Sequence, residues 1–74
     1  MFTYHLKGFG TTKAGVHHAD NDEEFKEYVK AMNAATRSVD MVPEYEWCKR
    51  YQGWGNSIDW DSETELDVNE LAAL

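Results

Sequence analysis

The sequence predicts an α+β fold, in which a small antiparallel sheet is covered on one face by an amphipathic helix. Three observations predict it. Residues 2–7 alternate between apolar and polar side chains, as strands do. Residues 21–39 repeat apolar side chains at the spacing of one helix face. Residues 57–68 alternate again, with acids on the odd positions. The expected order is strand, strand, helix, a short second helix, then one or two C-terminal strands.

The N-terminal segment is predicted to form a β-hairpin. Its first strand alternates apolar and polar side chains, and the Gly- and Thr-rich stretch that follows favours a turn. A shorter return strand around residues 15–18 would bring Val16 to the same face as Leu6. In that register, His5 and His17 would lie on the opposite face.

Residues 21–39 carry the clearest helix pattern. Asp20 or Asn21 can cap this helix, acids crowd its first turn, and Arg37 lies in its last turn, as the helix dipole favours. Its apolar face comprises Phe25, Tyr28, Val29, Met32, Ala35, Thr36 and Val39.

Residues 43–52 carry mixed signals. Pro43 at the start, acids early, bases late and Gly53 as a stop indicate a helix. Aromatic side chains on odd positions fit a strand as well. We expect a short helix, with a strand as the alternative.

The C-terminal segment, residues 57–74, contains six acids and no Lys or Arg. In a strand, alternate side chains point to one face about 6.6–6.8 Å apart. One strand over residues 57–68 would therefore present a row of carboxylates; two short strands turning at Ser62–Glu63 are the alternative. The last residues can close the chain as a short helical turn. The acids of the row are Asp59, Asp61, Glu63, Glu65 and Asp67.

Composition limits the function classes. A chain of 74 residues makes one small domain, residues 1–74, and 14% aromatic residues suffice for its core. The lone Cys48 allows no intramolecular disulfide, and no apolar run approaches a membrane span, so we expect a cytoplasmic protein. The net charge of −7 disfavours direct binding to nucleic acid or an anionic membrane and favours a basic protein partner.

The acidic row suggests nucleic-acid mimicry. DNA-binding proteins grip regularly spaced phosphates with Lys and Arg, and a row of carboxylates can occupy the same grip. Two alternatives remain open at this point: the acids protect an edge strand from aggregation, or they form a disordered solvated tail.

Three aromatic residues are candidate interface anchors. Phe9 and Trp54 each lie between two glycines, and Trp60 lies within the acidic row. Aromatic anchors with a polar rim are typical of interfaces. The alternative is that these side chains fold back onto a small core.

No catalytic or metal signature stands out. His5, His17 and His18 with Asp20 could approach one another in the hairpin, but they lack the ligand spacing of zinc sites, so no metal is expected. Cys48 has no evident base and is expected to be a structural thiol. We expect neither an enzyme nor a cofactor.

These features together predict a small acidic non-enzymatic inhibitor that binds the basic surface of a nucleic-acid-handling enzyme as a monomer or homodimer. Such a profile is typical of phage-encoded inhibitors of host or defence enzymes, which act in the host cytoplasm. The alternative is a regulatory or antitoxin-like module that binds by strand addition and aromatic anchors. The expected partner-binding residues are the five acids of the row with Phe9, Trp54 and Trp60.

Overall fold

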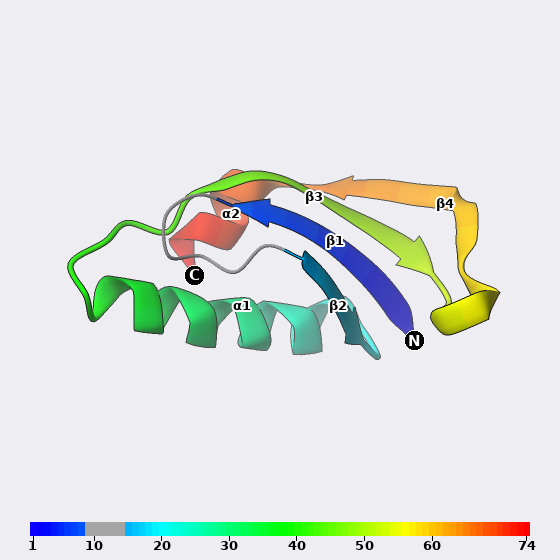
Figure 1. Cartoon of the computed structure of the whole chain (residues 1–74), viewed down its shortest axis with the longest axis horizontal. Coiled ribbons are helices and arrows are strands. Elements are labelled where there is room, and N and C mark those ends of the chain that lie inside the picture. Colours follow the sequence, from blue (N-terminus) through cyan, green and yellow to red (C-terminus); the bar gives the residue numbers. More distant parts are fainter. Residues whose placement is uncertain (9–14) are drawn as a thin grey trace.

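The computed structural model describes residues 1–8 and 15–74 and confirms the α+β class. Four antiparallel strands form one sheet in the order β2-β1-β3-β4, and both helices lie on the same side of it (Figure 1). A 3₁₀ turn, η1 (Gly55–Ser57), joins the last two strands. The elements along the chain are β1 (Phe2–Gly8), β2 (Gly15–Ala19), α1 (Asp22–Arg37), β3 (Tyr45–Gln52), β4 (Asp59–Leu66) and α2 (Val68–Ala73).

Helix α1 forms as its sequence predicts. Asn21 is the N-cap, and its side-chain oxygen accepts a hydrogen bond from the backbone N–H of Glu24 at 2.8 Å. Three acids occupy the first turn and Arg37 the last. The helix ends at Arg37, so Val39, expected on the apolar face, lies beyond it and is exposed.

The core lies between the sheet and the two helices. Tyr4 and Phe25 stack with ring centroids 3.9 Å apart and nearly parallel planes, which joins β1 to α1. On the rim of this core, Asp22 accepts a hydrogen bond from the Tyr4 hydroxyl at 2.6 Å and pairs with Arg50 of β3. The buried cluster consists of Tyr4, Leu6, Ala19, Phe25, Val29, Tyr45, Cys48 and Leu71.

The prediction of a short helix over residues 43–52 is wrong, because residues 45–52 form the central strand β3. It pairs with β1 on one side and with β4 on the other, so its backbone groups are satisfied by neighbouring strands. Glu46 and Arg50, which would have paired within a helix, instead form ion pairs with Lys7 and Asp22. Long-range pairing has overridden the local helix signals.

The expected register of the N-terminal hairpin is also wrong. Tyr4 pairs with His17, and His5 pairs with Val16. Directly paired residues share a face of the sheet, so His17 lies on the helix side and Val16 lies beside His5 on the other side. A hairpin register is set by its turn, and a one-residue shift exchanges the two faces.

The C-terminal segment forms one strand, β4, followed by the helix α2. Asp67 is the N-cap of α2 and accepts a hydrogen bond from the backbone N–H of Asn69 at 2.9 Å. The short helical ending is therefore confirmed. Among the described residues β4 pairs only with β3, so it is an edge strand of the sheet.

Candidate functional site

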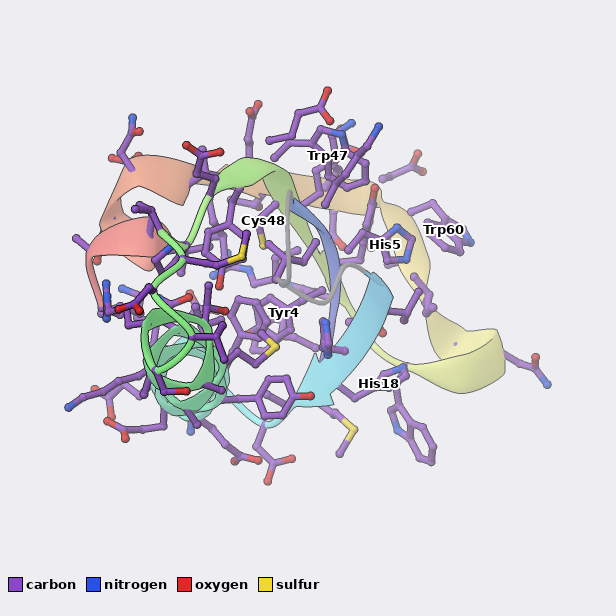
Figure 2. The ribbon with its side chains drawn as sticks, turned by 60° about the vertical axis from the view of Figure 1, so that its left-hand side comes forward. Tyr4, His5, His18, Trp47, Cys48 and Trp60 are labelled. Carbon is purple, nitrogen blue, oxygen red and sulfur yellow. The ribbon has the colours of Figure 1, made fainter. Side chains whose placement is uncertain are left out.

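The sheet face opposite the helices carries no covering element among the described residues. Figure 2 shows Trp47, His5 and Trp60 on this side, whereas Tyr4 and Cys48 lie between the sheet and α1. We call this surface the outer face and define it by the strand residues that the register and the side-chain contacts place there. They are Thr3, His5, Lys7, Val16, His18, Trp47, Lys49, Tyr51, Trp60, Glu63 and Glu65.

An aromatic cluster of His5, Tyr51 and Trp60 occupies the β4 side of the outer face. The ring centroids of Tyr51 and Trp60 are 5.0 Å apart in an edge-to-face arrangement. His5 lies 5.0 Å from Tyr51 and 5.7 Å from Trp60. Tyr51 is only 7% exposed, whereas Trp60 is 58% exposed. Trp60 therefore covers Tyr51 and still presents more than half of its own side chain to solvent.

An irregular bulge of several residues in β4 places Trp60 in this position. Arg50 and Gln52 are two residues apart on β3, but their partners on β4, Thr64 and Asp59, are five residues apart. β4 thus carries three extra residues at this point. The Ser62 hydroxyl braces the bulge, because it accepts from the backbone N–H of Gln52 at 2.8 Å and donates to the Asp59 carbonyl at 2.5 Å.

The bulge changes how the acidic row is arranged. An odd number of extra residues reverses the alternation of faces. Asp59 pairs with Gln52 and so shares the helix-side face, whereas Glu65 pairs with Lys49 on the outer face. The evenly spaced row expected from the sequence is therefore not formed, and the acids are distributed over both faces of one sheet edge.

Glu63 is the acid most closely integrated into the outer face. It accepts a hydrogen bond from the Tyr51 hydroxyl at 2.6 Å, and Lys49 lies 3.7 Å away. The hydrogen bond from Tyr51, followed by the charge of Lys49, lowers the pKa of Glu63. The same hydrogen bond raises the pKa of Tyr51.

The other four acids of the row have no such cation. The Asp59 carboxylate accepts a hydrogen bond from the backbone N–H of Asp61 at 3.1 Å, and Asp67 caps α2. Within residues 1–8 and 15–74, none of Asp59, Asp61, Glu65 and Asp67 belongs to an ion pair. The edge thus keeps unneutralised carboxylates at both ends of β4.

The structure separates the three expected aromatic anchors. Trp60 joins the aromatic cluster, while Trp54, which is 59% exposed, lies at η1 and turns its ring toward His18 of β2 at 6.5 Å. Phe9 lies outside the described residues. Of the eight residues expected to contact a partner, the structure brings only Trp60 and Glu63 into one cluster, through Tyr51.

The histidines do not converge. His5 faces Tyr51 and Trp60, whereas His17, on the helix side, lies 5.1 Å from the ring of Tyr28 and 6.3 Å from that of Phe25. In the part of the chain that the structure describes, no group of three or more His, Cys, Asp or Glu side chains could hold a metal ion. The described helices also include none that is long and apolar enough to cross a membrane.

Cys48 is fully buried on the helix side of β3. Burial, with a smaller contribution from the nearby charge of Asp22, raises the pKa of its thiol to about 12. A thiol held in this neutral form is a poor nucleophile at neutral pH. The arrangement favours a structural role.

Sequence reasoning missed Tyr51 and His5 as members of the site. The signal that could have found Tyr51 was present, since the odd-position aromatics of residues 45–51 fitted the strand alternative. His5 could be placed only with the strand pairing, because its neighbours come from β3 and β4.

Comparison with protein-family models, with curated proteins and with solved structures finds no significant match.

Proposed function

We propose that this chain is a non-enzymatic binding protein that inhibits a nucleic-acid-binding protein, such as a phage-encoded inhibitor of a host or defence enzyme, by occupying its basic surface. One observation carries the proposal: β4 is an edge strand, and its acids Asp59, Asp61 and Glu65, with Asp67 just beyond its end, belong to no ion pair among the described residues. Like charges collected on one edge oppose folding slightly, and a basic partner would offset their repulsion.

The bulge changes how the carboxylates are arranged, but the edge still presents the negative charge on which the proposed mimicry depends. A straight row would match one phosphate strand, whereas carboxylates on both faces of an edge suit a basic groove that closes around that edge. Phosphates of a duplex also lie on two sides of a groove, and proteins contact them mainly with Lys and Arg. The proposal is therefore that β4 enters the partner's nucleic-acid groove edge first.

The test is capture of partners from a host-type lysate by the tagged protein, at low and at moderate salt, with and without competing duplex DNA. We expect a nucleic-acid-binding protein that is released by salt and by DNA, because charge-driven association is screened. A partner that is retained under all four conditions would contradict mimicry.

Charge-removing variants test whether the acids of β4 are responsible for this binding. Asp61→Asn with Glu65→Gln removes two unneutralised charges from the edge and should weaken binding about tenfold or more, as losses of interfacial charge do. The matched control, Glu23→Gln with Glu27→Gln, removes the same charge from exposed positions of α1 and should change binding less than twofold. Equal losses in both double variants would mean that only net charge matters.

Strand addition is the second candidate, and the edge position of β4 favours it. An extended segment of a partner could pair with the free side of β4 through backbone hydrogen bonds. Such binding would tolerate salt and duplex DNA. The capture experiment therefore separates the two candidates directly.

A further inference from the structure

We propose that the exposed indole of Trp60 is the receptor for an arginine side chain of the partner, which stacks on the ring while a neighbouring carboxylate binds its guanidinium group. This inference rests on the proposed function, since it specifies which basic residue the β4 edge selects.

Trp60 is held in place but remains largely exposed to solvent. A chain of 74 residues has few large side chains for its core, yet this one is 58% exposed. The bulge aims it at the outer face, Ser62 braces the bulge on two strands, and Tyr51 supports the ring from below at 5.0 Å. A rigid, half-exposed Trp on a supporting aromatic is typical of an interface anchor.

Two cations on the same sheet each contact both an aromatic ring and a carboxylate. Arg50 lies over the ring of Phe2 at 5.2 Å and pairs with the carboxylate of Asp22. Lys49 lies 5.5 Å from the ring of Trp47 and 3.7 Å from the carboxylate of Glu63. Twice, therefore, a cation lies between an aromatic ring and a carboxylate.

Trp60 offers a ring, and the next residue, Asp61, offers a carboxylate, but no Lys or Arg among the described residues contacts either of them. Asp59, the residue before Trp60, shares the helix-side face, and its carboxylate accepts a hydrogen bond from the backbone N–H of Asp61. Neither Asp59 nor Asp61 belongs to an ion pair within the described residues. Across residues 1–8 and 15–74, no cation–π contact involves Trp60 either. The charge complementarity of the site thus calls for a cation supplied by the partner.

Arginine fits this position better than lysine. Its planar guanidinium is weakly hydrated, stacks on an indole face and donates two parallel hydrogen bonds to a carboxylate, whereas an ammonium group acts as a hydrated point charge. Bases of single-stranded nucleic acid also stack on exposed aromatic rings. Here their phosphates would meet the carboxylates of β4, so the charge favours a basic protein segment.

The test uses the full chain with Trp47→Phe and Trp54→Phe, which leaves Trp60 as its only tryptophan. Oligo-arginine and oligo-lysine of equal length are titrated while Trp60 fluorescence and the binding heat are measured. We expect oligo-arginine to bind about three- to fivefold more tightly, in line with the strength of exposed cation–π contacts, and to shift the Trp60 emission.

Single substitutions in the otherwise native chain test whether Trp60 causes the preference for arginine over lysine. Trp60→Ala should abolish the preference for arginine while leaving the salt-dependent binding of both oligomers, since the carboxylates remain. Trp54→Ala removes an equally exposed tryptophan and should leave the preference intact. Circular dichroism verifies that both variants fold.

Each other outcome has a separate meaning. Equal affinity for the two oligomers with unchanged Trp60 emission would overturn the arginine inference and leave the proposed function standing. Tighter binding of single-stranded DNA than of oligo-arginine, with a shift of Trp60 emission, would overturn the inference and assign the ring to base stacking. Failure of both oligomers to bind at low salt would count against the proposed function as well.

Discussion

Asn33 shows how one buried side chain joins separate elements of this small fold. Its amide nitrogen donates to the backbone carbonyl of Leu71 at 2.8 Å, and its amide oxygen accepts a hydrogen bond from the Tyr45 hydroxyl. The three residues belong to α1, α2 and β3. Without the amide, a buried hydroxyl and a buried carbonyl would both lose this partner.

Asn33→Ala should therefore lower the free energy of unfolding by about 2–3 kcal/mol, the usual cost of leaving buried polar groups unsatisfied. Urea denaturation followed by circular dichroism measures this change. Asn69→Ala, at an exposed position of α2, makes the same substitution without breaking a side-chain hydrogen bond found in the structure and should change stability by less than about 0.5 kcal/mol. Similar losses in both variants would contradict the structural role of Asn33.

Cys48 offers a second test at the level of one side chain. Because burial raises the pKa of its thiol to about 12, alkylation by iodoacetamide at pH 8 should require unfolding. The labelling rate measured by mass spectrometry should rise together with the unfolded fraction as urea is added. Rapid labelling in the absence of urea would show that the thiol is accessible in the folded protein.

At the scale of elements, the sequence correctly predicted the helix and the strand whose apolar side chains repeat along one buried face. Helix α1 and strand β1 were found because their apolar side chains repeat with a single period. Strand β3 was missed because it is covered on both faces: Cys48 lies toward the helices, and Tyr51 lies beneath Trp60. Its buried positions therefore do not alternate, and its end charges imitate those of a helix.

The candidate site was predicted only in part for a related reason. The alternation of residues 57–68 identified an acidic strand and included Trp60. It could not reveal the bulge, which depends on contacts between Ser62 and a different strand, β3. The aromatic cluster likewise depends on strand order, since its three members come from β1, β3 and β4.

The turn that leads from β3 to β4 provides a prediction for an element. Gly53 has a φ of +86°, and a Cβ atom added there would lie 2.2 Å from the carbonyl oxygen of Ser57. Gly53→Ala combines a left-handed backbone with this clash and should destabilise the protein by about 3 kcal/mol or more. Gly55, at φ +61°, has open space around its Cβ position, so Gly55→Ala should cost only about 1 kcal/mol.

Thermal or urea unfolding of the two glycine variants measures the difference. The comparison is internal, because both substitutions add one methyl group at a left-handed position of the same turn. Equal destabilisation would mean that the contact between Gly53 and the backbone of Ser57 is not maintained in solution.

At the scale of the whole molecule, the core and the proposed binding surface are on different parts of one sheet. The helices and the buried cluster lie on one side of the sheet and the outer face lies on the other, while the β4 edge borders both sides. The acids of β4 also blunt an exposed sheet edge, a common protection against edge-to-edge aggregation. Substitutions on the β4 edge can therefore change binding without removing the core.

The buried side of the sheet determines how stability depends on pH. Burial, and then the hydrogen bond to Asp22, raises the pKa of the Tyr4 hydroxyl above its ordinary value of 10.0, and burial raises the pKa of the Cys48 thiol from 9.0 to about 12. Both groups hold their protons more tightly in the folded than in the unfolded chain. Their contribution to stability is complete below pH 9 and is lost as the pH rises through 9 to 12, because the unfolded chain then releases protons that the folded chain retains.

We therefore expect the urea midpoint of the wild type to fall steadily between pH 9 and pH 11. Tyr45 and Tyr51 also have raised pKa values, through burial and through the hydrogen bond to Glu63 respectively, and add to this decline. Tyr4→Phe removes one of these groups and should make the decline shallower, although the variant starts from a lower midpoint at pH 7 because it loses the hydrogen bond to Asp22. A midpoint that stays constant from pH 8 to pH 11 would show that none of these groups is protected by the folded core.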